Sequence, residues 1–352
     1  MKNNSFVDCF MLMGTALSMR GGSKLPDMGR PLIQDVFTTF VNLSASIEEF
    51  KISDIKRMEF VVDGLLNQRW VDPRLGSNAR TRKMAVAGQI WKPMITNTNG
   101  RNRIPNNDDT IFWRGFGDEG NVLLSEKFQI EGSCSIDFHN FPFDVQFCQV
   151  EFGSYRFPSD EVSVIWESMG VDLLSKIKTN EFYLANVSTH VEINIRPSGN
   201  FSTAVVQFTL QRNPVHYIIC TGIPCMIMVL LNYISLWFSI SKRTTRFNIL
   251  FFSFVVNLYY FYASICLIQP VPYLKALDIF VGICMSFSIV SLLETFAIDF
   301  LCAEEEEEFH LKEKACSKEY PKSVYWIEVG LKVGYPLFYL FFVALYAATF
   351  LN

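Results

Sequence analysis

The sequence predicts an α+β membrane protein, with an extracellular β-sandwich of about ten strands followed by a four-helix transmembrane bundle. Short strand-like runs recur in the first half of the 352 residues, and four long apolar runs fill the second half. Half of all residues are hydrophobic, only 19% are charged, and mean hydropathy is +0.20, which is too apolar for an ordinary soluble protein. The net charge of −4 gives no indication of nucleic-acid binding.

Residues 1–19 form the first segment. Lys2 precedes an apolar run that Asp8 interrupts, so the segment is either a poor signal peptide or a short ordered helix. We expect the β-sandwich domain over residues 20–213 and the transmembrane domain over residues 214–352.

The β-sandwich domain is predicted from runs of apolar and β-branched residues with Gly, Asn and Pro between them. Such runs at short, regular spacing are typical of a sandwich rather than of an α/β fold. The predicted strands are residues 31–44, 52–66, 85–90, 110–116, 122–130, 149–152, 162–166, 190–195 and 203–211.

The compartment of this domain is indicated by cysteines and by glycosylation sequons. Cys134 and Cys148 enclose 13 residues, and two cysteines at this spacing can close a disulfide loop only in an oxidising compartment. Closing a loop of about 15 residues would stabilise the fold by about 3 kcal/mol. Asn-x-Ser/Thr sequons occur only before residue 213, which suggests that this half faces outward; they begin at Asn3, Asn42, Asn186 and Asn200.

The membrane half contains four apolar segments, each long enough for a helix that crosses a bilayer. Three basic residues between the first two segments indicate a cytoplasmic loop, and the N-terminal half is then outside. The predicted spans are residues 216–240, 247–268, 274–298 and 329–351, and the basic residues are Lys242, Arg243 and Arg246.

A charged stretch, residues 299–323, separates the third and fourth spans and includes five consecutive glutamates, Glu304 to Glu308. A run of like charges is usually solvated. We therefore expect a short, flexible cytoplasmic linker here.

The segment from Cys134 to Cys148 resembles the signature loop of the Cys-loop receptors, the pentameric ligand-gated ion channels. Asp137, the run Phe141-Pro142-Phe143-Asp144 and Gln146 fit that pattern. The alternative is a disulfide hairpin in an unrelated secreted β domain. The resemblance extends over both halves, through Trp70-x-Asp72-x-Arg74-Leu75, Trp91-Lys92-Pro93, Arg212-Asn213, Trp237, Arg246, Pro270, Tyr273, Lys275-Ala276 and Asp278.

The resemblance implies an agonist site between neighbouring subunits, in a box of aromatic rings that attract a ligand cation. Tyr155 and Phe201 match two positions of the box, unless they pack the subunit interface instead. The other matched positions lack aromatic rings and hold Thr96, Thr98, Leu65 and Asn67. Vicinal cysteines are absent, which argues against an acetylcholine-type site. No Arg or Lys falls on these positions, so a carboxylate ligand has no evident anchor.

The resemblance also makes residues 247–266 the pore-lining helix. Residues three and four apart share one face of a helix, and the face that begins at Asn248 continues with Phe252, Val255, Tyr259, Tyr262 and Cys266. Hydrophobic rings of this kind close a pore by dewetting. Thr245 and Arg246 occupy the selectivity region, where a basic ring weakly favours anions.

Coupling between the two halves is expected where the Cys loop meets the connector 269–273. Asp144 and Arg212 match residues that pair there in the family, with Phe141, Pro142 and Pro270 nearby. The pair either transmits motion or holds the domains together statically. Charge reversal at Asp144 should abolish assembly or gating, and the matching reversal at Arg212 should restore it.

The predicted function is that of a pentameric ligand-gated ion channel subunit in the plasma membrane. Its expected partners are four further identical or related subunits, the lipid bilayer and an unknown small-molecule agonist. The alternative is a ligand-binding or assembly subunit of the same fold that does not conduct. No cofactor or metal site is expected, and no Ser/His/Asp set, paired-carboxylate motif or phosphate loop suggests an enzyme.

Overall fold

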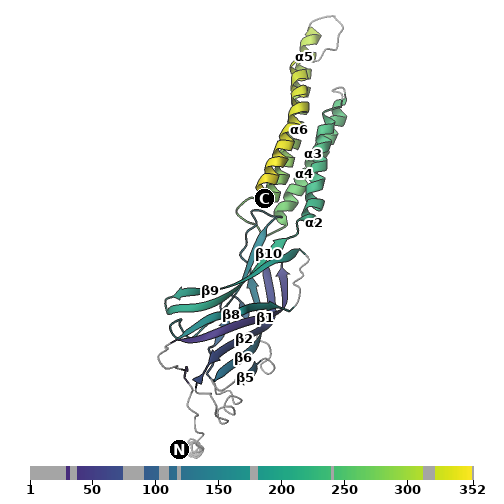
Figure 1. Ribbon diagram of the computed structural model, residues 1–352. Coiled ribbons are helices and arrows are strands. Elements are labelled where there is room, and N and C mark those ends of the chain that lie inside the picture. The colour runs from purple at the N-terminus through teal and green to yellow at the C-terminus, as the bar shows by residue number, and fades with distance from the viewer. Residues whose placement is uncertain are drawn as a thin grey trace, which may run out of the picture.

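The computed structural model describes residues 29–31, 38–73, 91–102, 111–116, 120–174, 181–238, 242–311 and 322–350. It consists of a β-sandwich joined to a bundle of long helices that extends away from one end of the sandwich (Figure 1). The predicted fold class is confirmed. The segment 1–19, the sequon at Asn3, the motif residues Arg74 and Leu75, and the predicted strand 85–90 lie outside the described residues.

Two sheets form the sandwich. In the first, the strand order is β4-β6-β2-β1-β8, β5 also pairs with β6, and β1 and β8 run parallel. Its strands are β1 (Thr39–Asp54), β2 (Glu59–Val71), β4 (Arg101–Asn102), β5 (Ile111–Phe116), β6 (Asn121–Ser133) and β8 (Val162–Leu173). The second sheet has the order β3-β7-β10-β9. Its strands are β3 (Ile95–Asn97), β7 (Val145–Ser154), β9 (Phe182–Arg196) and β10 (Gly199–Arg212).

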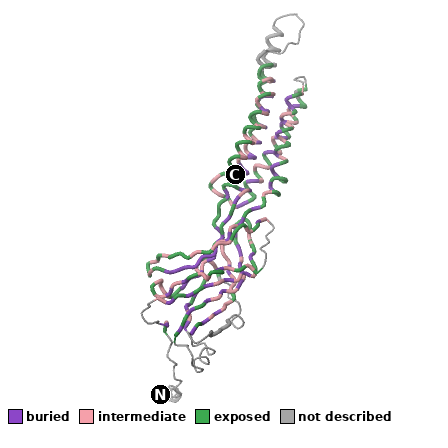
Figure 2. The backbone as a smooth tube through the Cα atoms, viewed as in Figure 1, coloured by how far each residue is buried: buried purple, intermediate pink, exposed green. Residues whose placement is uncertain are grey.

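The core lies between the sheets and follows the alternation of the strands. In β10, Ala204, Val206, Phe208 and Leu210 are completely buried, as expected when alternate side chains of a strand point to one face. Figure 2 shows buried stretches along the strands of the sandwich. The motif residues Trp70 and Trp91 are buried in this core and meet edge to face with ring centroids 6.1 Å apart.

Several strand boundaries differ from the prediction, and β8 and β9, for example, are longer than the predicted strands 162–166 and 190–195. Residues 52–54 were assigned to the second strand, but they end β1, and a turn separates them from β2. Inward alternation continues along β1 to Ile47 and resumes at Phe50 after a register shift, so the apolar pattern of β1 extends beyond the expected end at residue 44. The turn contains Met58 at a φ of 50°.

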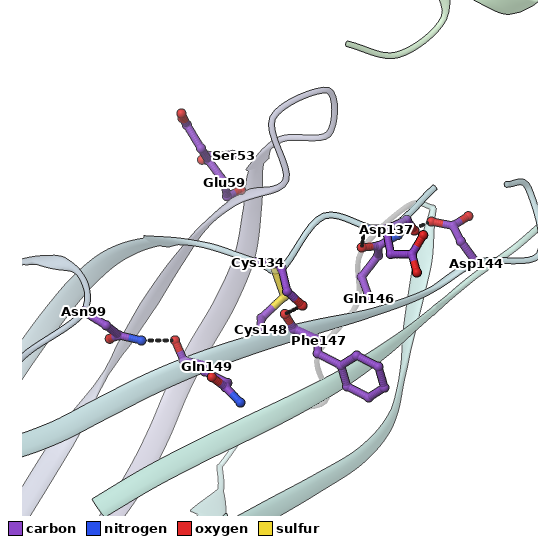
Figure 3. The surroundings of a disulfide bond; sticks show 11 residues. Ser53, Glu59, Asn99, Cys134, Asp137, Asp144, Gln146, Phe147, Cys148 and Gln149 are labelled. Carbon is purple, nitrogen blue, oxygen red and sulfur yellow. Dashed lines mark hydrogen bonds between the residues drawn. A yellow bond between two sulfur atoms is a disulfide. The ribbon is translucent and has the colours of Figure 1, made fainter. Parts of the chain in front are cut away.

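The Cys loop closes the end of the sandwich that faces the helices. Cys134 and Cys148 form a disulfide, and the backbone N–H of Ser135 donates to the Phe147 carbonyl beside it (Figure 3). Phe138 and Phe141 are completely buried beneath the loop, with ring centroids 6.4 Å apart. The loop therefore has a small apolar core that is shared with the membrane half.

The membrane half contains four helical stretches long and apolar enough to cross a bilayer. The first combines α2 (Val215–Tyr217), a π-helical turn (Ile218–Gly222) and α3 (Ile223–Ser235), and the others are α4 (Arg243–Cys266), α5 (Ala276–Leu311) and α6 (Lys322–Phe350). The flexible linker that we expected from residue 299 was wrong over residues 299–311. There α5 continues through the acidic run, since glutamate is a good helix former and the helix is already nucleated.

Candidate functional site

The candidate site is the junction where the Cys loop meets the membrane helices. Its first feature is a set of hydrogen bonds from the start of α5 to the Cys loop. The N–H groups of Ala276 and Leu277 donate to the carbonyls of His139 and Phe141, at 2.9 and 3.0 Å. The first N–H groups of a helix have no partner within the helix. The Cys loop therefore caps a membrane helix directly.

An aromatic contact joins the same loop to the connector before α5. The rings of His139 and Tyr273 stack with centroids 3.8 Å apart and planes 8° from parallel. The Tyr273 hydroxyl accepts a hydrogen bond from the N–H of Phe138 at 3.0 Å. The backbone N–H of His139, and then its ring, hold the pKa of the exposed Asp137 carboxyl below its usual range. Pro270 is exposed in this connector.

Arg212, the last residue of β10, is the centre of a buried ionic cluster. Its Nε and Nη2 donate to the two carboxylate oxygens of Asp144 at 2.7 and 3.1 Å, and both side chains are 1% exposed. Its Nη1 donates to Glu181 at 3.1 Å. The guanidinium also lies over the rings of Phe182 and Phe141, 4.3 and 4.9 Å from their centroids. Two carboxylates and two ring faces surround one cation.

This cluster reaches the membrane helices through Phe141 and Tyr217. Their rings meet with centroids 4.8 Å apart, and the Tyr217 hydroxyl donates to Glu181 at 3.2 Å. Pro142 is buried and follows a cis peptide bond. Four members of this junction were not predicted from the sequence, namely Glu181, Phe182, Tyr217 and His139. No spacing pattern singles out Glu181, because it reaches Arg212 only through the pairing of β9 with β10.

Two aromatic residues of the predicted ligand box lie toward the same end of the second sheet. Tyr155 follows β7 directly and is 76% exposed, whereas Phe201 on β10 is only 6% exposed. The guanidinium of Arg196 lies over the Phe201 ring, 5.1 Å from its centroid. The matched positions themselves carry no Arg or Lys, but Arg196 lies beside one of them, and Phe201 does not present an open ring in this conformation.

The remaining box residues divide between the two sheets. Thr96 is exposed on β3, and the Thr98 hydroxyl donates to Glu151 at 2.9 Å. Leu65 and Asn67 are half-buried on β2 in the other sheet, and Asn67 accepts a hydrogen bond from Ser125 at 2.6 Å. Within one chain these two do not complete the box.

The predicted pore face of α4 is turned away from the bundle. Phe252, Val255, Tyr259 and Tyr262 are 60%, 45%, 66% and 68% exposed. Asn248, Thr245 and Cys266 are exposed as well. The outward face is therefore mainly aromatic and aliphatic, as the helical spacing indicated.

Arg246 requires a correction, because it does not lie on the exposed face. Its side chain is 3% exposed and Nη2 lies 2.6 and 2.7 Å from the two carboxylate oxygens of Glu294 on α5. Nη1 lies 3.8 Å from Glu328 on α6. Carboxylates inside the bundle neutralise its charge, so Arg246 does not form the free basic ring from which anion preference was inferred.

The described sequons, Asn42, Asn186 and Asn200, have exposed side chains on strands β1, β9 and β10. Their glycosylation stays a prediction. Among the described residues, no group of three or more His, Cys, Asp or Glu side chains could hold a metal ion.

A β-sandwich whose disulfide-closed loop caps a membrane helix defines the class of Cys-loop receptors. Residues 24–214 match the family model described as the neurotransmitter-gated ion-channel ligand binding domain. The chain belongs to this family, which is one of ion-channel receptors rather than of enzymes.

Curated relatives align with most of the chain. It is 23% identical over 320 residues to human gamma-aminobutyric acid receptor subunit gamma-1, covering 87% of this chain and 66% of the relative. It is 28% identical over 308 residues to human gamma-aminobutyric acid receptor subunit rho-2, covering 83% and 64%. The gamma-4 subunit of Gallus gallus is 22% identical over 319 residues, covering 88% and 68%. The chain thus spans only part of the length of these relatives. With its four spans, it is a multi-pass plasma-membrane protein whose β-sandwich is extracellular.

Proposed function

We propose that the chain is a subunit of a pentameric ligand-gated ion channel, in which an extracellular ligand at the subunit interface controls a central pore. The observation that supports this most strongly is the capping of α5 by the Cys loop. Residues 20–213 would bind the ligand, and residues 214–352 would form the pore. Four further copies or related subunits would complete the ring.

Coupling would pass through the cluster around Arg212. Motion of β10 displaces Arg212, which is bound to the Cys loop through Asp144. The loop holds the start of α5, and Lys275 beside it donates to the Ser264 carbonyl near the end of α4 at 3.0 Å. A shift of the sandwich would therefore reach both α4 and α5 without any flexible link between them.

The ligand would be a small molecule with a carboxylate. The relatives are named as receptors for gamma-aminobutyric acid, which has such a group. Arg196 lies over Phe201, and Arg156 is exposed next to Tyr155. Guanidinium groups recognise carboxylates through paired hydrogen bonds.

Replacement of Arg196 by glutamine should weaken the response to carboxylate agonists. Loss of one charge-assisted hydrogen bond costs about 1.5–3 kcal/mol, so the half-maximal agonist concentration should rise about tenfold or more. Concentration–response recordings measure this shift. The matched control is Lys51→Gln on β1, since Lys51 is exposed and pairs with Glu49. An unchanged response would remove Arg196 from the ligand site.

The second candidate is a subunit of the same fold that does not conduct alone. The apolar outward face of α4 and the neutralised Arg246 favour it, because neither supplies a hydrophilic path for ions. With Arg246 paired to Glu294, no ion preference is assigned to its charge.

The double substitution Phe252→Ser with Val255→Ser distinguishes the two functions. If rings of these side chains close the pore, polar replacements should hydrate it and give a standing current in cells that express the chain alone. Voltage clamp with and without a panel of amino-acid ligands measures this current, and Phe338→Ser on the exposed face of α6 is the control. A variant that reaches the cell surface but stays silent would support the subunit that does not conduct.

A further inference from the structure

The side of α4 that faces the bundle is the polar one. Ser253, Asn257 and Ser264 are completely buried, whereas the side chains on the opposite side are mostly apolar and exposed. Positions 246, 253, 257 and 264 lie along one stripe of the helix, since they are separated by four or seven residues. From Ser253 onward, the buried polar side chains of α4 thus make their contacts inside the subunit, whereas Thr245 and Asn248 near its start are exposed.

The middle of this stripe is a node of three helices. The amide Nδ2 of Asn257 on α4 donates to the Ser288 hydroxyl on α5 at 2.9 Å. The Nδ2 of Asn232 on α3 donates to the same oxygen at 2.8 Å. One hydroxyl therefore holds two amides, and all three side chains are completely buried.

The polar atoms of the node are only partly paired by hydrogen bonds. Among the described residues, neither the Oδ1 of Asn232 nor that of Asn257 has a hydrogen-bond partner. The buried Asn257 amide, which donates to Ser288, is costly to move, because breaking that bond would leave the group unpaired in an apolar medium. The Ser288 hydroxyl is therefore one atom through which α4, α5 and α3 are joined in the middle of the bundle.

The stripe makes further contacts at both of its ends and at Ser253 in its middle. Arg246 meets Glu294 at the start of α4, and the Ser264 hydroxyl donates to Asp278 at 2.9 Å near its end. Ser253 donates to the Met228 carbonyl of α3 at 3.2 Å. In the middle turns, Ser253 contacts a backbone carbonyl of α3, whereas the node joins α4 to both α3 and α5, so the node constrains the rotation of these turns from two sides.

We propose that the node of Asn232, Asn257 and Ser288 sets the rotation of α4 about its own axis. It keeps the stripe with Ser253 inside the subunit and turns the face with Phe252 outward. These three are positioning residues for the pore face, and the proposal rests on the proposed role of α4 as the pore helix. Without the node, the middle of α4 turns and exposes part of its polar stripe.

Thiol labelling tests this in the full-length chain in membranes, in a Cys266→Ala background because Cys266 is an exposed thiol on α4. Ser253→Cys reports the inward side and Phe252→Cys the outward side, each read by mass spectrometry of the α4 peptide. Adding Ser288→Ala should raise the labelling rate at position 253 about tenfold and lower that at position 252, since tenfold corresponds to about 1.4 kcal/mol, within the range for unpaired buried amides.

Two variants control for loss of folding. Ser286→Ala lies on the same helix and removes an exposed hydroxyl that donates to the Gly282 carbonyl of its own helix. It should leave both rates unchanged. Ser288→Thr keeps the hydroxyl and should restore the original rates. If Ser288→Ala does not fold, Asn257→Ala gives the same comparison.

An unchanged labelling pattern in folded Ser288→Ala or Asn257→Ala overturns the proposal. The labelling measurement does not require the chain to conduct ions. A chain that gives no current when expressed alone but shows the change in labelling would favour the subunit that does not conduct and keep the role of the node.

Discussion

The substitution Asp144→Asn should prevent the chain from reaching the cell surface in its folded form. Arg212 would lose its main counter-charge while 1% exposed, and breaking a buried ion pair in this way costs about 3–5 kcal/mol. Whole domains are stable by only about 5–15 kcal/mol. Surface biotinylation and thermal unfolding of the purified chain measure the loss.

Asp137→Asn is the matched control, since that carboxyl lies in the same loop with its side chain 69% exposed. It should reach the surface at near-normal levels. Normal surface levels of Asp144→Asn would show that Glu181 and the aromatic rings suffice to hold Arg212.

The structure makes the expected result of exchanging the charges of Asp144 and Arg212 more specific. With Asp144→Arg and Arg212→Asp, the new carboxylate would lie beside Glu181 and would lose the attraction of the Phe182 and Phe141 rings for a cation. Rescue should therefore be partial. Adding Glu181→Gln should improve it, and no improvement would mean that repulsion from Glu181 is not the limiting factor.

The second large effect is expected at the inner end of the bundle. Glu294→Gln would leave Arg246 without its close carboxylate, at 3% side-chain exposure, and should lower the stability of the detergent-solubilised chain by about 3 kcal/mol. Thermal unfolding measures this. Glu328→Gln is the control, because Glu328 lies farther from Arg246, at 3.8 Å, and also pairs with Lys332. Equal effects of the two would contradict the dominant role of Glu294.

The sequence could predict what local pattern determines. The apolar runs indicate the spans, the alternation indicates the strands, and the Cys134–Cys148 segment identifies the loop. Helical spacing places Phe252, Val255 and Tyr259 on one face of α4. It also implies that Arg246, six residues before Phe252, lies on a different face, yet Arg246 was assigned to the selectivity region by resemblance alone.

What the sequence could not predict depends on contacts between distant elements. Glu181 reaches Arg212 across β9 and β10, and Arg196 covers Phe201 across the same hairpin. The continuation of α5 through Glu304–Glu308 was missed because charge composition was given more weight than helix propensity. In each case the outcome depended on the surrounding fold, which a local reading of the sequence does not contain.

The hydrogen bonds from Ala276 and Leu277 to His139 and Phe141 have a consequence for biosynthesis. The third membrane helix completes its first turn with acceptors that only the finished extracellular module provides. An insertion intermediate whose luminal part is still unfolded would carry bare amide groups at the membrane boundary. Maturation of the two halves is then one cooperative event, and neither half should be expected to acquire its native form when produced separately.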